Sequence, residues 1–274
     1  MTDRVRNAHA LAVVVLFALI AAFTVAGFAA RSWLPPAASR HAAGVDGVIR
    51  YLVWTTGAVL VIGHAALVAF LWRYRGVQVA ESPAVAARTE RLWSLVPVIG
   101  MALIAELGVL VKGLPVWAQV YGPPPDDALV VEVTAKQFEW WVRYPGPDGR
   151  FGRTAPEFVD LQRNPAGLDR DDPDAADDIV LRNALHVPAG RAVHVRLRSR
   201  DVLHSFWIPA FRVKQDVVPG IAGRALFVPT EPGEYEIGCA ELCGMGHYRM
   251  RGRVIVHTQD GFERWQAERG RAGA

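Results

Sequence analysis

The sequence has little cysteine and little charge, and both shortages narrow the possible classes of protein. Its 274 residues include only 2 cysteines, which cannot build a disulfide-stapled scaffold. No C-x-x-C-H motif occurs, which excludes a covalently attached c-type haem on this chain. Charged residues make up 21% of the chain, and the net charge of +3 is too small to indicate a nucleic-acid-binding protein.

Apolar residues are abundant instead. They account for 51% of the sequence, and the mean hydropathy of +0.16 argues against a purely soluble protein. The charge is also uneven: residues 1–125 contain 10 Lys and Arg against 5 Asp and Glu, whereas residues 126–274 contain 20 against 22. We therefore expect a basic first part and a slightly acidic second part to face different surroundings.

Three apolar stretches, at residues 10–30, 51–72 and 92–111, are long enough to cross a bilayer as helices. A span needs ~20 helical residues at ~1.5 Å each to cross the ~30 Å hydrocarbon layer. The first stretch follows Arg4 and Arg6, so a cleaved signal peptide is the alternative, although 21 apolar residues exceed a usual signal core.

His64 in the second span is interpreted as a packing residue. Glu106 in the third is expected to face protein or water, either in a pair with a neighbouring subunit or as a protonated carboxyl without a role.

The distribution of basic residues predicts the orientation of the spans, because Lys and Arg beside a span stay in the cytoplasm. Two stand before the first span and four between the second and third: Arg4, Arg6, Arg73, Arg75, Arg88 and Arg91. Segment 31–50 and everything after the third span are therefore predicted to lie outside, in the periplasm of a bacterium. Five tryptophans fall near span ends, as an interfacial belt requires: Trp33, Trp54, Trp72, Trp93 and Trp117.

The remainder of the sequence has the pattern of an all-β domain. We predict an anchor over residues 1–121, a proline-rich linker over 122–128, a β domain over 129–260 and a tail over 261–274 that begins as a helix. Seven short segments are expected to be strands: 129–135, 138–144, 179–182, 192–198, 225–228, 235–237 and 253–257. Because no helical crossovers separate them, an antiparallel Greek-key β-sandwich or barrel is expected.

A polar insertion at residues 145–178 interrupts the strands. Six of its last ten residues are acidic: Asp169, Asp171, Asp172, Asp174, Asp177 and Asp178. This run is interpreted as a solvated loop. The alternative is a docking site for a basic partner protein, since residues 126–195 contain 13 acidic against 8 basic side chains.

Two thiols stand in a motif near the C-terminus, Cys239-Ala-Glu-Leu-Cys243-Gly-Met-Gly-His247-Tyr-Arg-Met250. Thiolate, imidazole and thioether suit copper better than magnesium or calcium, and zinc rarely binds methionine. Two thiolates four residues apart can each bridge two metal ions, which gives a dinuclear cluster. In such a cluster each copper ion also binds one imidazole, so two histidines are needed. The second imidazole is expected from His204, 35 residues before Cys239. Three other histidines lie in the same domain: His186, His194 and His257.

With these residues, the chain resembles subunit II of haem–copper cytochrome c oxidases. The family motif C-x-E-x-C-x-x-x-H-x-x-M is matched at 239–250, and a second motif, D-V-L-H-S-F-W-I-P followed by K-Q-D-V-V-P-G, at 201–220. The resemblance extends over about 49–266 and implies a cupredoxin-like fold. The extra N-terminal span departs from the common two-span form.

The resemblance also implies a set of ligands for the dinuclear copper centre called CuA. The side-chain ligands would be His204, Cys239, Cys243, His247 and Met250. Glu241 would offer its backbone carbonyl to copper, and its carboxylate to a magnesium ion shared with subunit I.

Two further roles follow from the same resemblance. Electrons enter the family's copper domain at a tryptophan just after a glutamine, but the matching residue here is Phe138, with Trp140 and Trp141 as substitutes or as ordinary sheet packing. Glu90 matches the carboxylate that opens a proton-uptake path into subunit I. A plain helix-start carboxylate is the alternative for Glu90.

The implied function is electron transfer from cytochrome c through two copper ions to haem in subunit I, where oxygen is reduced to water and protons are translocated. Subunit I, subunit III, cytochrome c and the lipid of a bacterial inner membrane are the expected partners. Four alternatives remain: a membrane-tethered copper carrier, a disulfide or thiol relay, a quinol-oxidising subunit II, which lacks the copper ligands, and a nitrous-oxide reductase, which needs a large additional domain.

Overall fold

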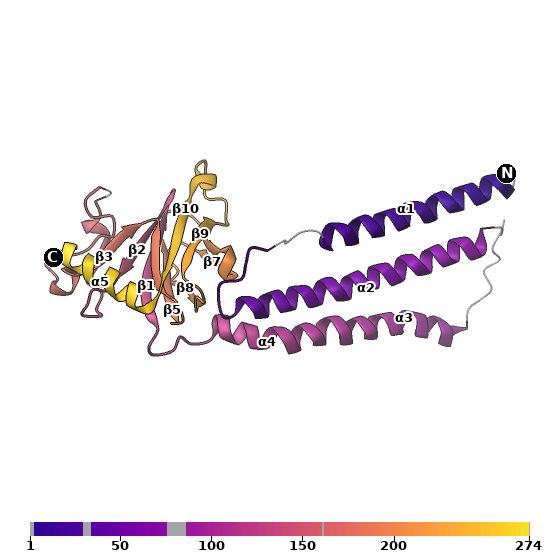
Figure 1. The fold of residues 1–274 in the computed structure, drawn as a ribbon, viewed down its shortest axis with the longest axis horizontal. Coiled ribbons are helices and arrows are strands. Elements are labelled where there is room, and N and C mark those ends of the chain that lie inside the picture. The colour runs from indigo at the N-terminus through magenta and orange to yellow at the C-terminus, as the bar shows by residue number, and fades with distance from the viewer. Residues whose placement is uncertain (1–2, 30–33, 76–85, 161, 274) are drawn as a thin grey trace. The chain divides into compact units, whose positions relative to one another are not determined.

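The structure is a computed structural model that describes residues 3–29, 34–75, 86–160 and 162–273. The chain divides into two compact units (Figure 1). One contains residues 1–33 and 46–114, and the other contains residues 34–45 and 115–274. The first is helical and the second is built around β-strands, so each is described by itself.

The helical unit is formed from long apolar helices. They are α1 (Asp3–Ala29), α2 (Ala42–Tyr74), α3 (Ala87–Met101) and α4 (Leu107–Tyr121), with a π-helical turn, η1 (Ala102–Glu106), joining α3 to α4. Asn7–Ala29, Ala42–Tyr74 and Ala87–Tyr121 are each long and apolar enough to cross a membrane. The prediction of three N-terminal apolar helices is therefore confirmed. The second and third extend well beyond the predicted 51–72 and 92–111, because their polar ends continue the helix past the apolar stretch.

His64 packs within this unit. Its Nδ1 lies 2.8 Å from the carbonyl oxygen of Leu60, and its ring meets the ring of Phe17 edge-on at 5.2 Å between centroids. A hydrogen bond within the helix and an aromatic contact with α1 agree with the interpretation of His64 as a packing residue.

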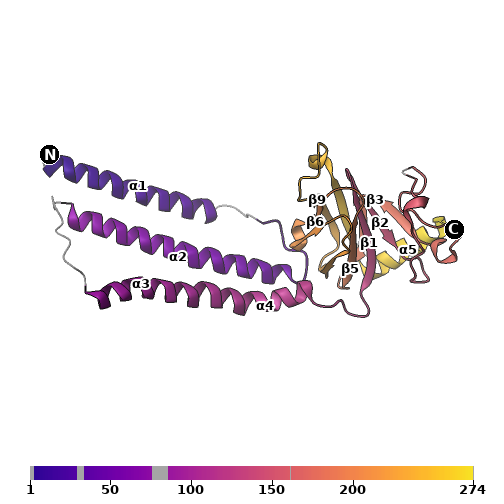
Figure 2. The ribbon, with the colours of Figure 1, turned by 180° about the vertical axis from the view of Figure 1, so that it is seen from behind.

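The β unit is a sandwich of two five-stranded sheets (Figure 2). One sheet has the strand order β3-β2-β1-β5-β8 and the other β4-β10-β9-β6-β7. Their bounds are β1 (Leu129–Lys136), β2 (Glu139–Tyr144), β3 (Ile179–Arg182), β4 (Ala184–Pro188), β5 (Val193–Ser199), β6 (His204–Ile208), β7 (Val213–Val217), β8 (Gly223–Phe227), β9 (Gly233–Cys239) and β10 (Arg251–His257). The expected all-β sandwich is confirmed.

The sheets are mixed, however, and the expectation of a purely antiparallel arrangement is wrong. β1 pairs in parallel with β5, and β10 pairs in parallel with β4. Both pairs join strands that are far apart in the sequence, so the two-residue hairpin that dictates antiparallel pairing does not constrain them. Strand patterns alone carry no signal for such long-range pairing.

The core lies between the two sheets. Along β1, buried Leu129, Val131, Val133 and Ala135 alternate with side chains on the outer face, which is the pattern of a strand with one covered side. Fully buried aromatic side chains fill the middle of the core: Trp140, Tyr144, Phe206, Phe211 and Phe227. The helix α5 (Gln259–Gly273) follows β10 and covers one part of the sandwich with Phe262 and Trp265.

A strap of residues 34–45, which precedes α2, belongs to the β unit. Its backbone is bonded to the sandwich: Ala38 N donates to the carbonyl of Ala210 at 2.9 Å, and Arg40 N donates to that of Val228 at 3.0 Å. Ala38, His41 and Ala42 are at most 4% exposed. The strap is therefore packed against the β domain, although it leads directly into α2.

The acidic insertion is organised by ion pairs. Buried Arg143 bonds through Nη1 to Asp178 Oδ2 at 2.9 Å, and through Nε to Glu132 Oε2 at 3.0 Å. Arg153 pairs with Asp169, which is only 4% exposed. Burial raises the pKa of Asp178 to about 6, although the charge of Arg143 opposes this change. The interpretation of the run as a solvated loop is therefore wrong for Asp169 and Asp178, which are paired with arginines and shielded from solvent. The sequence alone does not show that these arginines lie near them.

Candidate metal centre

Strand register brings the predicted ligands to one end of the sandwich. Cys239 is the last residue of β9, and His204 is the first residue of the adjacent β6. β6 and β9 pair antiparallel with Phe206 opposite Cys239, so that His204 lies near the start of the ligand loop. That loop carries Cys243, a short 3-10 turn, η5 (His247–Arg249), and Met250 before the chain enters β10.

The distances between ligand atoms form a chain of close contacts. Cys239 Sγ and Cys243 Sγ are 3.9 Å apart, and both thiols are free. Cys239 Sγ lies 3.9 Å from His204 Nδ1 and 3.2 Å from the carbonyl oxygen of Glu241. Cys243 Sγ lies 3.6 Å from His247 Nδ1 and 3.8 Å from Met250 Sδ. Each sulfur is therefore next to one imidazole and to one weaker donor.

The site is largely buried. His204 and Met250 are 0% and 1% exposed, and Cys243 is 4% exposed, whereas Cys239 and His247 are half-buried. The ligating atoms of His204, Cys239 and Cys243 lie within 4.8 Å of one another. A set of two thiols, two imidazoles and a thioether fits soft or borderline metals such as copper, and it does not fit magnesium or calcium, which prefer oxygen ligands.

Interactions around the ligands orient them. Asp201 Oδ1 lies 2.9 Å from His204 Nε2, which directs Nδ1 of the same ring towards Cys239. Asp201 also accepts hydrogen bonds from the backbone nitrogens of Gln137, at 2.8 Å, and Val202, at 2.7 Å. The side-chain amide of Gln137 donates to the carbonyl of Cys243 at 2.6 Å. Asp201 therefore holds the ring of His204, and Gln137, which directly follows β1, holds the backbone of the ligand loop at Cys243.

Neither Asp201 nor Gln137 was assigned a role from the sequence. Both lie inside motifs that the sequence analysis singled out, at three residues before His204 and one residue before Phe138. A polar residue at a fixed short distance from a predicted ligand is the signal that would have found Asp201. Gln137 is 106 residues from Cys243, and no local pattern predicts that contact.

The electrostatics of the two thiols differ. Burial raises the pKa of Cys239, but hydrogen bonds with His204 and with backbone groups outweigh burial and lower it to about 6. Burial raises the pKa of Cys243, and the negative charge of Cys239 raises it further. Two thiolates this close together therefore need a cation between them, which a bound metal ion provides.

The predicted aromatic residues are placed differently with respect to the site. The ring of Phe138 lies against the ligand loop, where a Cβ on Gly246 would collide with it and one on Gly244 would lie 3.4 Å from it. Trp140 is fully buried, with its ring centroid 6.2 Å from that of His204. Trp141 is half-buried and donates from Nε1 to Glu139 at 2.8 Å. The structure therefore brings Phe138 and Trp140 to the site and does not bring Trp141 there.

Glu90 and the carboxylate of Glu241, the other two predicted groups, are placed as follows. Glu90 lies in the first turn of α3, in the helical unit. For Glu241, the carbonyl faces Cys239, but the structure shows no partner for its carboxylate among the described residues. A magnesium ion at Glu241 would thus need ligands from another chain or from solvent.

The surface over the ligand loop is apolar. Leu242, Met245 and Tyr248 are 78%, 96% and 71% exposed, and we call these three residues the apolar tip. They lie on the same loop as the buried Cys243, so the tip is a part of the surface close in sequence to the ligands.

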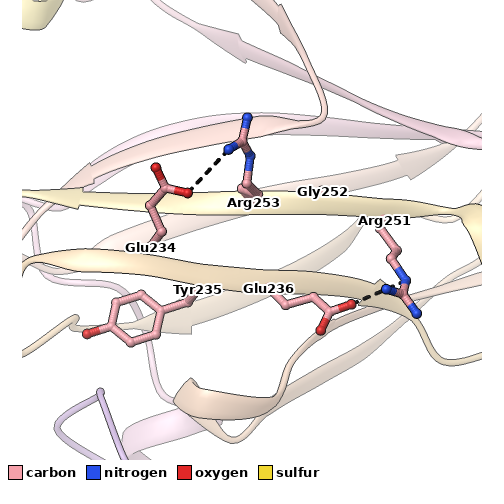
Figure 3. Close-up of a pocket in the computed structure, with 6 residues that line it drawn as sticks. All are labelled: Glu234, Tyr235, Glu236, Arg251, Gly252 and Arg253. Atoms are coloured by element: carbon pink, nitrogen blue, oxygen red, sulfur yellow. Dashed lines mark hydrogen bonds and ion pairs between the residues drawn. The ribbon is translucent and has the colours of Figure 1, made fainter.

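A shallow groove on the outer face of β9 and β10 is a separate feature (Figure 3). Figure 3 shows cross-strand pairs along it: Glu236 with Arg251 at 3.4 Å, and Glu234 with Arg253 at 3.3 Å. Both pairs are more than half exposed, so each contributes little to stability. The groove is lined by no thiol or imidazole.

Comparison with known proteins agrees with the geometry. Residues 151–258 match the family model described as the periplasmic domain of cytochrome c oxidase subunit II. The chain is 39% identical over 226 residues to the alternative cytochrome c oxidase subunit 2 of Bradyrhizobium diazoefficiens. This alignment covers 81% of this chain and 78% of that protein. It is 32% identical over 226 residues to the heme-copper oxidase subunit 2 of Aeropyrum pernix, which covers 77% of this chain and 85% of that protein.

Among solved structures, the periplasmic domain of subunit II of cytochrome oxidase from Bradyrhizobium japonicum is similar to this chain. The two are 28% identical, with a TM-score of 0.41, over 56% of this chain and 100% of that domain.

Proposed function

Because the chain belongs to the cytochrome c oxidase subunit II family, we propose that it is the electron-transfer subunit of a terminal haem–copper oxidase. In this role it accepts electrons from cytochrome c and passes them to haem in subunit I, where oxygen is reduced to water and protons are translocated. One observation carries the proposal: two free thiols, Cys243 buried and Cys239 half-buried, lie 3.9 Å apart at one end of the sandwich, each next to an imidazole.

The proposed ligands divide into two equivalent halves. Cys239 and Cys243 would bridge two copper ions, and His204 and His247 would bind one ion each. Met250, next to Cys243, and the carbonyl of Glu241, next to Cys239, would complete the two coordination spheres. When bound, the copper pair supplies one-electron redox chemistry.

The protein's part is to hold these ligands still. Asp201 orients the ring of His204, and the amide of Gln137 fixes the backbone of the ligand loop at Cys243. Ligands that cannot rearrange keep the geometry the same in both oxidation states, so that little energy is needed to move atoms when an electron arrives.

We propose that electrons enter through the apolar tip and Phe138. The tip is exposed, and the ring of Phe138 lies directly against the ligand loop. The acidic run is less suitable for docking a basic donor, because Asp169 and Asp178 are already paired with arginines. Trp140 is fully buried behind His204, so it would act as packing for that ring or as an inner conductor.

The membrane arrangement is proposed in the same terms. The chain would be an inner-membrane protein of a bacterium with its copper domain in the periplasm, bound to subunit I and to subunit III. The strap supports this orientation, since it ties the segment before α2 to the β domain. Glu90 would then lie at the cytoplasmic side, where it would open a proton-uptake path into subunit I. A magnesium ion at the carboxylate of Glu241 would be shared with subunit I.

The test is the replacement of one thiol in the intact oxidase. Cys239→Ser or Cys243→Ser should abolish the mixed-valence electron paramagnetic resonance signal and the oxidation of cytochrome c, while the haem content of the complex stays unchanged. Survival of the signal in either variant contradicts the ligand assignment. One labile copper(I) ion per chain in the unaltered protein would instead favour a copper carrier.

A further inference from the structure

The third apolar helix, Ala87–Tyr121, changes its geometry in its middle. The chain stays helical throughout, but Ala102–Glu106 forms a π-helical turn between α3 and α4. A π-helical turn contains an extra residue, so it leaves the regular hydrogen-bond ladder locally open, and such turns are often found at functional sites.

One side of this turn is used by the neighbouring helix α2. The hydroxyl of Tyr51 donates to the carbonyl oxygen of Ile104, which lies within the turn. Gly108 makes room for this contact, because a Cβ at that position would collide with the Tyr51 ring. Lys112 Nζ lies 5.7 Å from the centroid of the same ring. The α2 side of the turn is therefore occupied.

Glu106 lies on the other side. It is two residues from both Ile104 and Gly108, which is about half a turn in an α-helix and slightly less in the wider π-helical turn, so it lies roughly opposite to their face. Its side chain is exposed, and it has no hydrogen bond or ion pair with any residue that the structure describes. We call the exposed row formed by Ile99, Leu103, Glu106 and Leu110 the membrane stripe, and its three apolar members are 53%, 59% and 51% exposed.

The depth of Glu106 makes this exposure costly. It lies 13 residues after Trp93 and 11 residues before Trp117, the tryptophans expected at the two membrane interfaces. At ~1.5 Å per residue it is ~20 Å from one and ~17 Å from the other, which is the middle of a ~30 Å hydrocarbon layer. A carboxylate at this depth is expensive when it faces lipid, and in membrane proteins it almost always faces protein or water.

We propose that the membrane stripe is the contact surface for a membrane helix of a partner subunit, and that this helix presents a hydrogen-bond donor, such as a basic or amide side chain, to Glu106. The apolar members of the stripe have the spacing of a helix-packing face. The single carboxylate then specifies the register and the chemistry of the partner helix. That the partner is the haem-bearing subunit rests on the function proposed above.

The experiment uses the whole chain produced together with the other subunits. The complex is purified through a tag on this chain in mild detergent, and haem absorbance per chain is measured. Glu106→Leu should lower the retained haem about three- to tenfold, because an interhelical hydrogen bond is lost. Glu106→Gln, which keeps an acceptor oxygen, should retain more haem than Glu106→Leu. Glu157→Leu, the same change on the exposed surface of the β unit, is the matched control and should have no effect.

Two results would overturn the proposal. Retention of haem by Glu106→Leu at the level of the unaltered chain is expected if Glu106 faces lipid. Retention by Glu106→Gln that is no better than that by Glu106→Leu would reject the hydrogen bond. In every variant, near-infrared absorption of the copper centre reports whether the β unit is folded.

A second measurement separates this proposal from the proposed function. A photoreactive residue at Leu103 leaves Glu106 intact and should form a protein adduct. If the unaltered chain retains no haem, the oxidase function is contradicted, but an adduct still supports the stripe. Labelling of lipid alone would overturn the stripe.

Discussion

Asp201 shows how a residue that is not itself a ligand can determine the metal centre. Its Oδ1 lies 2.9 Å from Nε2 of buried His204, and its other contacts are backbone nitrogens. The ring of His204 has no exposed surface, and Asp201 is the partner of its Nε2. The orientation of the imidazole towards Cys239 thus depends on one carboxylate.

We expect Asp201→Asn to weaken copper retention about 10- to 100-fold, as loss of a partner around a metal ligand typically does. The measurement is competition with a copper chelator, followed by the near-infrared absorption of the centre. Asp216→Asn is the matched control, since Asp216 is 48% exposed and pairs with Lys214 on the same sheet. Equal retention by Asp201→Asn and the unaltered chain would contradict this account of His204.

The strap is an element whose importance becomes clear only in three dimensions. Ala38 is 2% exposed and belongs to the hydrophobic core of the sandwich, whereas the adjacent Ala37 is exposed. We predict that Ala38→Asp lowers the free energy of unfolding of the β unit by about 2–4 kcal/mol, because it buries an unpaired carboxylate or detaches the strap. Ala37→Asp should change it by less than about 0.5 kcal/mol. Chemical denaturation of the full chain in detergent measures both, and equal effects would contradict the burial of the strap.

A second element, α5, covers a pair of histidines that are not part of the copper site. His186 Nδ1 and His257 Nε2 are 2.8 Å apart, and Trp265 of α5 stacks on His186 with centroids 4.3 Å apart. Burial, helped by the charges of His257 and Arg269, lowers the pKa of His186 to about 4, and burial also lowers the pKa of His257. The folded state therefore keeps both rings neutral at a pH where the unfolded chain is protonated.

This difference sets the direction of a pH effect. An unfolded histidine titrates near ~6.5, so between about pH 6.5 and 4 these two histidines bind more protons in the unfolded chain, and their contribution to stability falls as the pH falls. The raised pKa of Asp178 acts in the opposite direction and offsets part of this loss. We predict a loss of about 1–3 kcal/mol between pH 7.5 and 4.5, measured as the free energy of unfolding of the full chain. His186→Gln should flatten much of the dependence, and His194→Gln, on the other sheet, should preserve most of it. A pH profile unaffected by His186→Gln would refute the assignment.

At the scale of the whole molecule, the proposed path of electrons runs from the apolar tip to the buried ligands. Met245→Ser should reduce the affinity for cytochrome c about fivefold, because exposed apolar anchors carry much of the energy of such contacts. Phe158→Ser is the control, since Phe158 is 41% exposed but lies in η2 (Pro156–Phe158), within the acidic insertion. Steady-state oxidation of cytochrome c at several donor concentrations measures the effect. A KM that is unchanged by Met245→Ser but raised by Phe158→Ser would place the docking surface elsewhere.

How far the sequence predicts this molecule depends on the range of each interaction. The apolar helices, the all-β sandwich and the grouping of Cys239, Cys243, His247 and Met250 follow from local patterns. The contact of Gln137 with Cys243, the packing of the strap and the parallel pairs β1–β5 and β4–β10 join distant segments, and no local pattern specifies them. The solvated-loop interpretation of the acidic run fails for the same reason, because Arg143, the partner of Asp178, lies on β2, 35 residues earlier.

The central claim is that Cys239 and Cys243 together hold two metal ions. X-ray absorption at the copper edge, combined with the copper content per chain of the purified full-length protein, tests it most directly. The account predicts two copper ions per chain, each with sulfur and imidazole neighbours and with a second copper in close contact. A single metal ion with no metal neighbour, or a covalent bond between the two sulfurs, would contradict it.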